Sequence, residues 1–122
     1  MKKRVKGRIL SREKDQRRAL LRSLARQLLL KEKIKTTESK AKEVASFVEK
    51  KITKSKLQNL SARRELLKDF SPEIVKKMMT EIAERFKERK GGYTRIIKIG
   101  PRKSDGAKMA LIEIISKEDK LF

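Results

Sequence analysis

Apolar residues in the first 90 positions recur at spacings of three and four, which is the period of an amphipathic helix. The clearest run lies between Asp15 and Lys31. A hydroxyl, a proline and an acid at Ser71-Pro72-Glu73 form a helix start signal. The pattern predicts helices at about 15–31, 38–54, 61–68 and 71–89, the second of them capped by Thr37.

After residue 90 the pattern changes to alternation, which is typical of strands. Gly91-Gly92 can adopt the positive φ that ends a helix, and the residues that follow, Tyr93–Ile99, are mostly β-branched or aromatic. Ala107–Ile115 alternates as well, and the turn formers of 100–106 should join the two strands as an antiparallel hairpin. Lys33–Thr37 predicts a further short edge strand.

The 122 residues suit a single α/β domain (1–122), which we divide into a basic extended arm (1–12), a folded body (13–116) and a tail (117–122).

The net charge of the chain indicates an anionic partner. There are 36 basic and 16 acidic residues, a net charge of +20, and residues 1–31 hold 12 of the bases but only 2 of the acids. A compact body with this excess repels itself unless an anionic partner such as nucleic acid neutralises it.

The chain has neither cysteine nor histidine, which removes disulfides, thiolate chemistry and the usual general base near neutral pH. Only carboxylates are left as metal ligands, so we expect no metal, no cofactor and no small-molecule substrate. No apolar run approaches the roughly 18 residues of a membrane span, and no apolar signal-peptide core follows the first lysines. We therefore expect a soluble, cytoplasmic protein without a membrane partner.

The first cationic group is the N-terminal arm, which is too poor in apolar residues to order itself. We favour an arm that folds along phosphates, and the alternative is a solubilising tail or a targeting signal. Its candidate RNA contacts are Lys2, Lys3, Arg4, Lys6, Arg8 and Arg12.

The second group continues from the arm along the first predicted helix. Arg18, Arg22 and Arg26 are four residues apart, so three guanidinium groups share one polar stripe. Such a stripe is often only a solvated helix face. Because this one extends the basic arm into a continuous cationic track, we favour a contact with phosphates.

A third group surrounds the start of the second predicted helix. Lys40 and Lys42 lie in its first turn, where the helix dipole already presents positive charge. These lysines are poorly placed for helix stability but well placed for an anion. We expect a phosphate contact there that also involves Thr36 and Thr37.

The last group begins at the strand after the glycine pair. Tyr93 and Arg95 share one side of that strand, where they could stack on bases, although the glycines are expected mainly to stop the preceding helix. The loop at 100–106 adds Arg102 and Lys103 as candidate contacts.

One run in this region, Gly91-Gly92-Tyr93-Thr94-Arg95-Ile96, is specific. Other motifs are Gly7-Arg8, Leu10, Arg12, Arg17, Arg22, Ile34-Lys35-Thr36-Thr37, Ala41-Lys42-Glu43, Ile52-Thr53, Arg63-Arg64, Arg102, Asp105, Ala107, Met109 and Ile112-Glu113. In this order they resemble the bacterial-type large-subunit ribosomal protein L17 family nearly end to end.

The resemblance implies a two-layer α/β fold of about four helices on a small three-stranded mixed sheet, in the order α-β-α-α-α-β-β. It implies a structural, non-enzymatic role in the large ribosomal subunit, in contact with its long ribosomal RNA and with neighbouring ribosomal proteins near the peptide exit tunnel, without homo-oligomerisation. It also adds Arg17, Lys35, Arg63, Arg64 and Thr94 to the expected RNA contacts.

Two other functions stay open. Basic amphipathic helices also enter the major groove of DNA, although the chain shows no clear helix-turn-helix and no dimerisation heptad. A metal-dependent nuclease would use Asp105 and Glu113, but two carboxylates are few for such a site and Asp105-Gly106 is typical of a turn.

Overall fold

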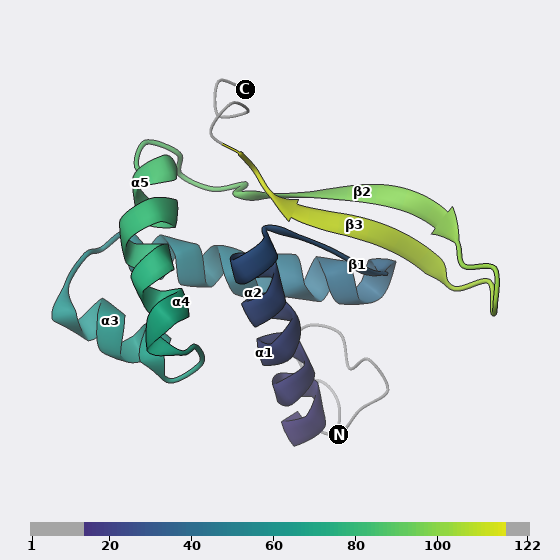
Figure 1. Ribbon diagram of the computed structural model, residues 1–122, viewed down its shortest axis with the longest axis horizontal. Coiled ribbons are helices and arrows are strands. Elements are labelled where there is room, and N and C mark those ends of the chain that lie inside the picture. The colour runs from purple at the N-terminus through teal and green to yellow at the C-terminus, as the bar shows by residue number, and fades with distance from the viewer. Residues whose placement is uncertain (1–13, 117–122) are drawn as a thin grey trace, which may run out of the picture.

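The computed structural model describes residues 14–116, which form helices packed on a three-stranded sheet (Figure 1). The elements are α1 Lys14–Lys31, β1 Lys33–Thr37, α2 Glu38–Ser55, α3 Leu60–Leu67, α4 Pro72–Lys77, the π-helical turn η1 Met78–Ile82, α5 Ala83–Arg85, β2 Thr94–Pro101 and β3 Lys108–Ile114. The segments α4, η1 and α5 follow one another without a gap and form one helix with a π-helical turn inside it. The predicted fold class and element order are therefore confirmed.

The strand order is β1-β3-β2, and both neighbouring pairs are antiparallel. The expected mixed sheet is wrong in this respect. β1 and β2 run in the same direction, but β3 lies between them, so no parallel pair forms within the described residues. Figure 1 shows β2 and β3 as a long hairpin that runs along α2 and ends in a loop far from α5. The predicted hairpin and the predicted edge strand β1 are confirmed.

One face of the sheet packs on the helices and forms the core. Ile112 lies at the centre of this face, directly between Ile34 of β1 and Ile96 of β2. The α2 face that meets it consists of fully buried residues, as its spacing predicts: Ala41, Val44, Val48 and Ile52. α1 buries only its C-terminal half, through Ala25, Leu28 and Leu29. The apolar pattern of α1 is thus longer than the surface that the body offers to cover it.

Two helix starts are capped by side chains, and one of these caps, at Ser71, was predicted from the sequence. The side chain of Ser71 accepts a hydrogen bond from the backbone N–H of Ile74 at 3.4 Å. Asn59 does the same for Ala62 at 2.7 Å, so α3 begins at Leu60, one residue before its predicted start. Thr37 occupies the cap position of α2, but its side chain makes no capping hydrogen bond.

The last helix ends earlier than predicted, at Arg85 rather than Arg89, because Phe86 has already left the helical region at φ −107° and ψ 18°. The glycine pair therefore does not terminate the helix. Gly92 instead adopts φ +64°, a left-handed conformation that costs a side-chain-bearing residue energy, and this turns the chain toward β2.

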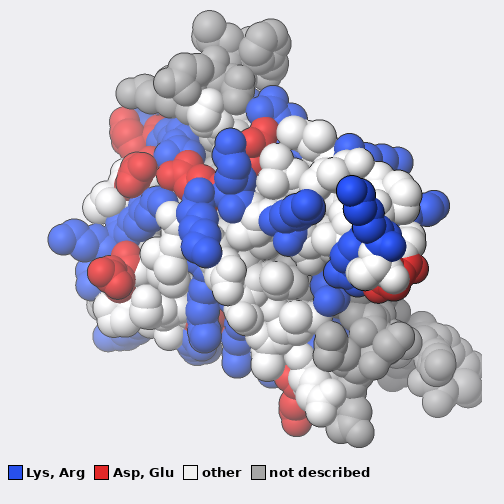
Figure 2. Space-filling model, turned by 45° about the vertical axis from the view of Figure 1, so that its right-hand side comes forward, with Lys and Arg blue, Asp and Glu red and all other residues white. Residues whose placement is uncertain are grey.

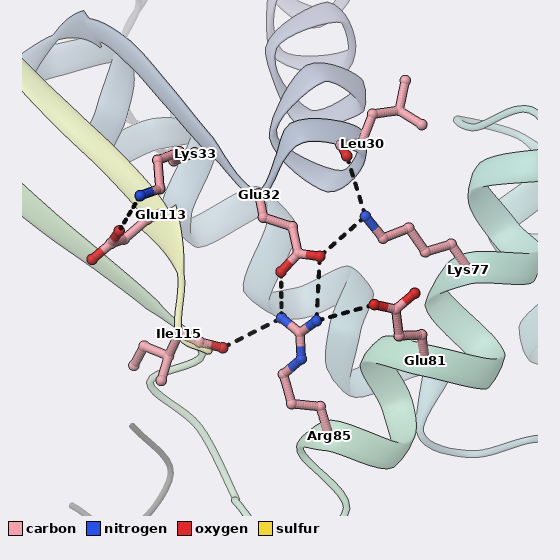
Figure 3. Close-up of polar contacts among 8 residues, drawn as sticks. All are labelled: Leu30, Glu32, Lys33, Lys77, Glu81, Arg85, Glu113 and Ile115. Atoms are coloured by element: carbon pink, nitrogen blue, oxygen red, sulfur yellow. Dashed lines mark hydrogen bonds and ion pairs between the residues drawn. The ribbon is translucent and has the colours of Figure 1, made fainter. Parts of the chain in front are cut away.

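An ion-pair cluster holds the corner between α1 and β1 (Figure 3). The Glu32 carboxylate accepts hydrogen bonds from both terminal nitrogens of Arg85, at 2.5 and 3.2 Å, and pairs with Lys77 at 3.2 Å. The carbonyl of Glu32 accepts from Ile114 N–H at 2.8 Å. Hydrogen bonding to Arg85 lowers the pKa of Glu32 despite partial burial. The corner is thereby tied both to the last helix and to the end of β3.

We expect Glu32→Gln to lower the free energy of unfolding by about 1 to 3 kcal/mol at neutral pH, because Arg85 and Lys77 lose a charged acceptor. Since the pKa of Glu32 is lower in the folded state, its contribution is present above the ordinary glutamate pKa and is lost as the pH falls through the folded value.

Urea unfolding of both proteins between pH 7 and pH 3 measures this difference, which should shrink toward the acidic end. Glu88→Gln is the matched control because Glu88 is exposed and makes no ion pair with another described residue. A difference that is independent of pH would contradict a role for the Glu32 charge.

The two neighbouring glycines should respond differently to alanine. Gly92→Ala places a Cβ on a backbone at φ +64° and should cost about 1 to 2 kcal/mol of stability. Gly91 lacks a positive φ and has open space around it, so Gly91→Ala should be neutral or slightly stabilising. Thermal unfolding of the pair checks this, and equal melting temperatures would show that the turn at Gly92 carries no strain.

Candidate nucleic-acid interface

Six of the predicted RNA contacts belong to the N-terminal arm and lie outside the described residues: Lys2, Lys3, Arg4, Lys6, Arg8 and Arg12. The other sixteen lie within them. Basic side chains are spread over the face in Figure 2 in several groups separated by uncharged surface, with acidic side chains among them. The described cations thus form several patches, each of which has a different local environment.

The arginines of the predicted stripe on α1 differ in their contacts. Arg17 is half-buried and Arg18 is exposed, as a phosphate contact would require. Arg22 donates through Nε to the Asp69 carboxylate at 2.7 Å, and Arg26 donates through Nε and Nη2 to the Asp69 carbonyl oxygen at 3.0 and 2.9 Å. Two of the three stripe arginines are therefore fixed in place by a residue 47 and 43 positions away.

Asp69 also receives Lys51 of α2, whose ammonium lies 2.7 Å from the second carboxylate oxygen. Burial raises the pKa of Asp69, but the bonds to Lys51 and Arg22 outweigh it and leave the pKa below its ordinary value. Sequence reasoning missed both Asp69 and Lys51. Neither is part of a local pattern, because α1, α2 and the loop before α4 meet here only in the folded chain.

The patch at the start of α2 is partly as predicted. Lys35 and Lys42 are exposed and Lys40 is half-buried. The side chain of Thr36 is 8% exposed, because it lies on the helix-covered face of β1 opposite Ala110, so Thr36 is a poor candidate for an RNA contact. An open cleft here is lined by Thr37, Glu38, Ser39, Lys42, Ala107 and Lys108. Glu38 makes this cleft less cationic than the lysines alone predict.

Tyr93 is buried, which contradicts the expectation that its ring could stack on bases. Its side chain is 1% exposed, and its ring packs against Phe86 with the centroids 5.0 Å apart. The hydroxyl accepts hydrogen bonds from Lys56 Nζ at 3.1 Å and from Thr53 Oγ1 at 3.3 Å. β2 begins one residue later, so strand alternation does not govern Tyr93, and the aromatic ring gains most by entering the core.

The next two positions are also engaged inside the protein. Thr94 donates through its N–H and its hydroxyl to Glu49, at 3.2 and 2.7 Å. Arg95 remains about half exposed on the outer face of the sheet, where its Nε donates to Glu113 at 2.8 Å. Further along β2, Ile97 and Ile99 are 43% and 48% exposed.

In the hairpin loop Lys103 is exposed, and Arg102 forms a bidentate pair with Asp105, at 2.9 and 2.7 Å. Arg102 lowers the pKa of Asp105 to about 2, helped by the N–H of Ala107, and the pKa of Arg102 is raised in turn. The loop therefore offers one exposed lysine and one guanidinium that is oriented by Asp105.

On α3, Arg63 and Arg64 are both exposed, and neither makes an ion pair with another described residue. They stand beside Leu60 and Leu67, whose side chains are 61% and 38% exposed. The predicted pair is thus available to a partner.

The structure gives the nuclease hypothesis no shared site. Asp105 lies in the hairpin loop, whereas Glu113 lies near the other end of β3, paired with Arg95 and with Lys33 at 3.9 Å. Among residues 14–116 no three acidic side chains gather in a way that could hold a metal ion. Over the same residues, no helix has the length and apolar character needed to cross a membrane.

Comparison with known proteins agrees with this arrangement. The family model described as ribosomal protein L17 matches residues 20–115. The chain is 52% identical over 107 residues to the "Large ribosomal subunit protein bL17" of Caldanaerobacter subterraneus subsp. tengcongensis, covering 87% of this chain and 96% of that one. The proteins of the same name from Staphylococcus epidermidis (47% over 117 residues, 87% and 96%) and Natranaerobius thermophilus (50% over 107 residues, 87% and 95%) are similar to it as well. The chain therefore belongs to the ribosomal protein L17 family.

Proposed function

We propose that this chain binds the long RNA of the large ribosomal subunit and fixes its local structure, in the way that a structural ribosomal protein does. Its family makes it a structural constituent of the large subunit, and so of a particle that is cytoplasmic in bacteria. The main observation in support of RNA binding is that the basic side chains lie in separate patches on α1, α2, α3 and the β2–β3 hairpin. Such a distribution suits a folded polyanion that surrounds the protein.

The proposed RNA contacts within the described residues are those whose charge faces solvent. They are Arg17, Arg18, Arg22, Arg26, Lys35, Lys40, Lys42, Arg63, Arg64, Arg95, Arg102 and Lys103. Thr37 can contribute its hydroxyl because its side chain makes no capping bond to α2. Tyr93 and Thr36 are left out because they are buried, and Thr94 because Glu49 holds it. Each cation that meets a phosphate would release a counterion, which makes binding dependent on salt.

Three further points belong to the same proposal. The arm (1–12) is proposed to extend the RNA contact surface from the start of α1, and 1–122 to act as one domain with the tail at 117–122. Contact with neighbouring large-subunit proteins near the peptide exit tunnel is proposed from family membership. The exposed Ile97 and Ile99 support a protein contact, because aliphatic side chains suit protein surfaces better than RNA.

We expect the full-length protein to bind transcribed large-subunit ribosomal RNA more tightly than duplex DNA, by about tenfold or more, at equal ionic strength. The reason is that the cations are spread over several elements and are not concentrated on one recognition helix that could enter the major groove of DNA. Filter binding from 50 to 300 mM salt measures both, and the RNA affinity should fall steeply with salt. Equal affinity for both nucleic acids would instead support the DNA-binding alternative.

In cell extracts we expect the protein to sediment with the large subunit and to leave it only in high salt. A protein that stays free of ribosomes at moderate salt would contradict the proposal.

The exposed pair on α3 gives a test at the level of residues. Arg63→Gln combined with Arg64→Gln should reduce the slope of log affinity against log salt by about 1 to 2, one for each lost phosphate contact. The melting temperature should not change, since both side chains are exposed and make no ion pair with another described residue. An unchanged slope would remove α3 from the proposed RNA contacts.

A further inference from the structure

Three cations from two helices converge on one residue in the loop before α4. We call Arg22, Arg26, Lys51 and Asp69 the Asp69 cluster. Arg22 and Lys51 take separate oxygens of the carboxylate at 2.7 Å each, and Arg26 takes the backbone carbonyl of the same residue. Three positive charges thus share a small volume with one negative charge, which leaves a local excess of two.

This excess is held rigidly. Phe70, next to Asp69, is 4% exposed and packs edge to face on Phe47 with the ring centroids 6.3 Å apart. The ammonium of Lys51 lies 5.3 Å from the centroid of the Phe47 ring. Packing therefore fixes Asp69 and Lys51 before any ligand arrives, so an anion that binds here meets cations whose conformational entropy is already lost.

The cluster also keeps hydrogen-bond donors in reserve. Arg22 binds Asp69 through Nε alone. Neither of its two terminal nitrogens makes a hydrogen bond to a described residue. Arg26 likewise keeps Nη1. The side chains of Arg22 and Lys51 are 34% and 20% exposed, and Arg26 is exposed. The unused donors can therefore reach a ligand at the surface.

We propose that the Asp69 cluster is a preorganised binding site for a backbone phosphate of ribosomal RNA, with Arg22, Arg26 and Lys51 as its ligands and Asp69 as a positioning residue. This inference rests on the proposed function and adds Lys51 and Asp69 to it. A phosphate suits the site because it supplies the missing negative charge and because its oxygens accept the parallel N–H groups of a guanidinium. Arg18 is exposed one turn before Arg22 on the same side of α1, where it could contact the next phosphate of the RNA backbone.

Lys51 and Lys50 provide a matched test, because they are adjacent on α2 and only Lys51 belongs to the cluster. We expect Lys51→Gln to weaken binding to transcribed large-subunit ribosomal RNA by about tenfold or more, since a charge-assisted bond in a preformed site is lost. Lys50→Gln, with the same change in net charge, should weaken it by only about twofold. Equal losses would overturn the proposal, because charge alone would then explain the binding.

Asp69 provides a test that depends on the direction in which the RNA affinity changes. Asp69→Asn makes the chain more positive, so general attraction to a polyanion predicts tighter binding. The proposed positioning role predicts weaker binding, because the amide can no longer hold both Arg22 and Lys51. Glu88→Gln adds the same charge at an exposed position and should bind slightly tighter than wild type. Tighter binding by both variants would overturn the proposal.

Thermal unfolding of each variant separates a loss of fold from a loss of site. If Asp69→Asn fails to fold, the comparison of Lys51→Gln with Lys50→Gln decides the proposal by itself. Failure of the wild-type protein to prefer ribosomal RNA would instead overturn the proposed function. Wild-type binding with no difference between the two lysine variants would overturn only the phosphate site.

Discussion

The ion pair between Glu32 and Arg85 is the contact on which the arrangement of the two layers depends. Glu32 has φ +65° and forms the corner at which the chain leaves α1 and enters β1. Its carboxylate holds Arg85 at the end of the last helix, and Arg85 also donates to the carbonyl of Ile115 just after β3. One carboxylate thus connects the start of the sheet, its central strand and the helix that is farthest along the chain. Lys77 and Arg85, which come from the same helix, share this carboxylate as a counter-charge.

Glu32 is one case of a general constraint on this protein. With 36 basic residues and 16 acidic ones, the chain has few carboxylates, and several of them stand where distant elements meet. Asp69 joins α1 and α2 to the loop before α4, Glu49 joins α2 to the start of β2, and Glu113 joins β3 to Arg95 of β2. In each case one acid fixes cations or donors from another element. The remaining excess of charge needs a polyanion to neutralise it, and RNA is the polyanion that we propose.

Under the proposed function the same cations would serve two purposes, the fold and RNA binding. Arg22 binds Asp69 through one nitrogen and has two nitrogens left that could bind a ligand, so it can stabilise the fold and still contact a phosphate. Arg102 is oriented by Asp105 in a similar way at the tip of the hairpin. A guanidinium can do this because it carries five donors in a fixed plane, whereas a lysine held by a carboxylate has its remaining N–H donors on a single nitrogen.

The sequence by itself determined the helices, the strands and their order, because those depend on periodicity, on glycine and on caps such as Ser71, all of which are local. It also determined the family and the excess of positive charge. Only the tertiary structure decided that Tyr93 enters the core, that both strand pairs of the described sheet are antiparallel and that the last helix ends at Arg85, because each depends on packing between segments remote in sequence. The same holds for the cations: a stripe at four-residue spacing predicts which arginines share a face, but Asp69 and Lys51 come to that face only when three elements meet.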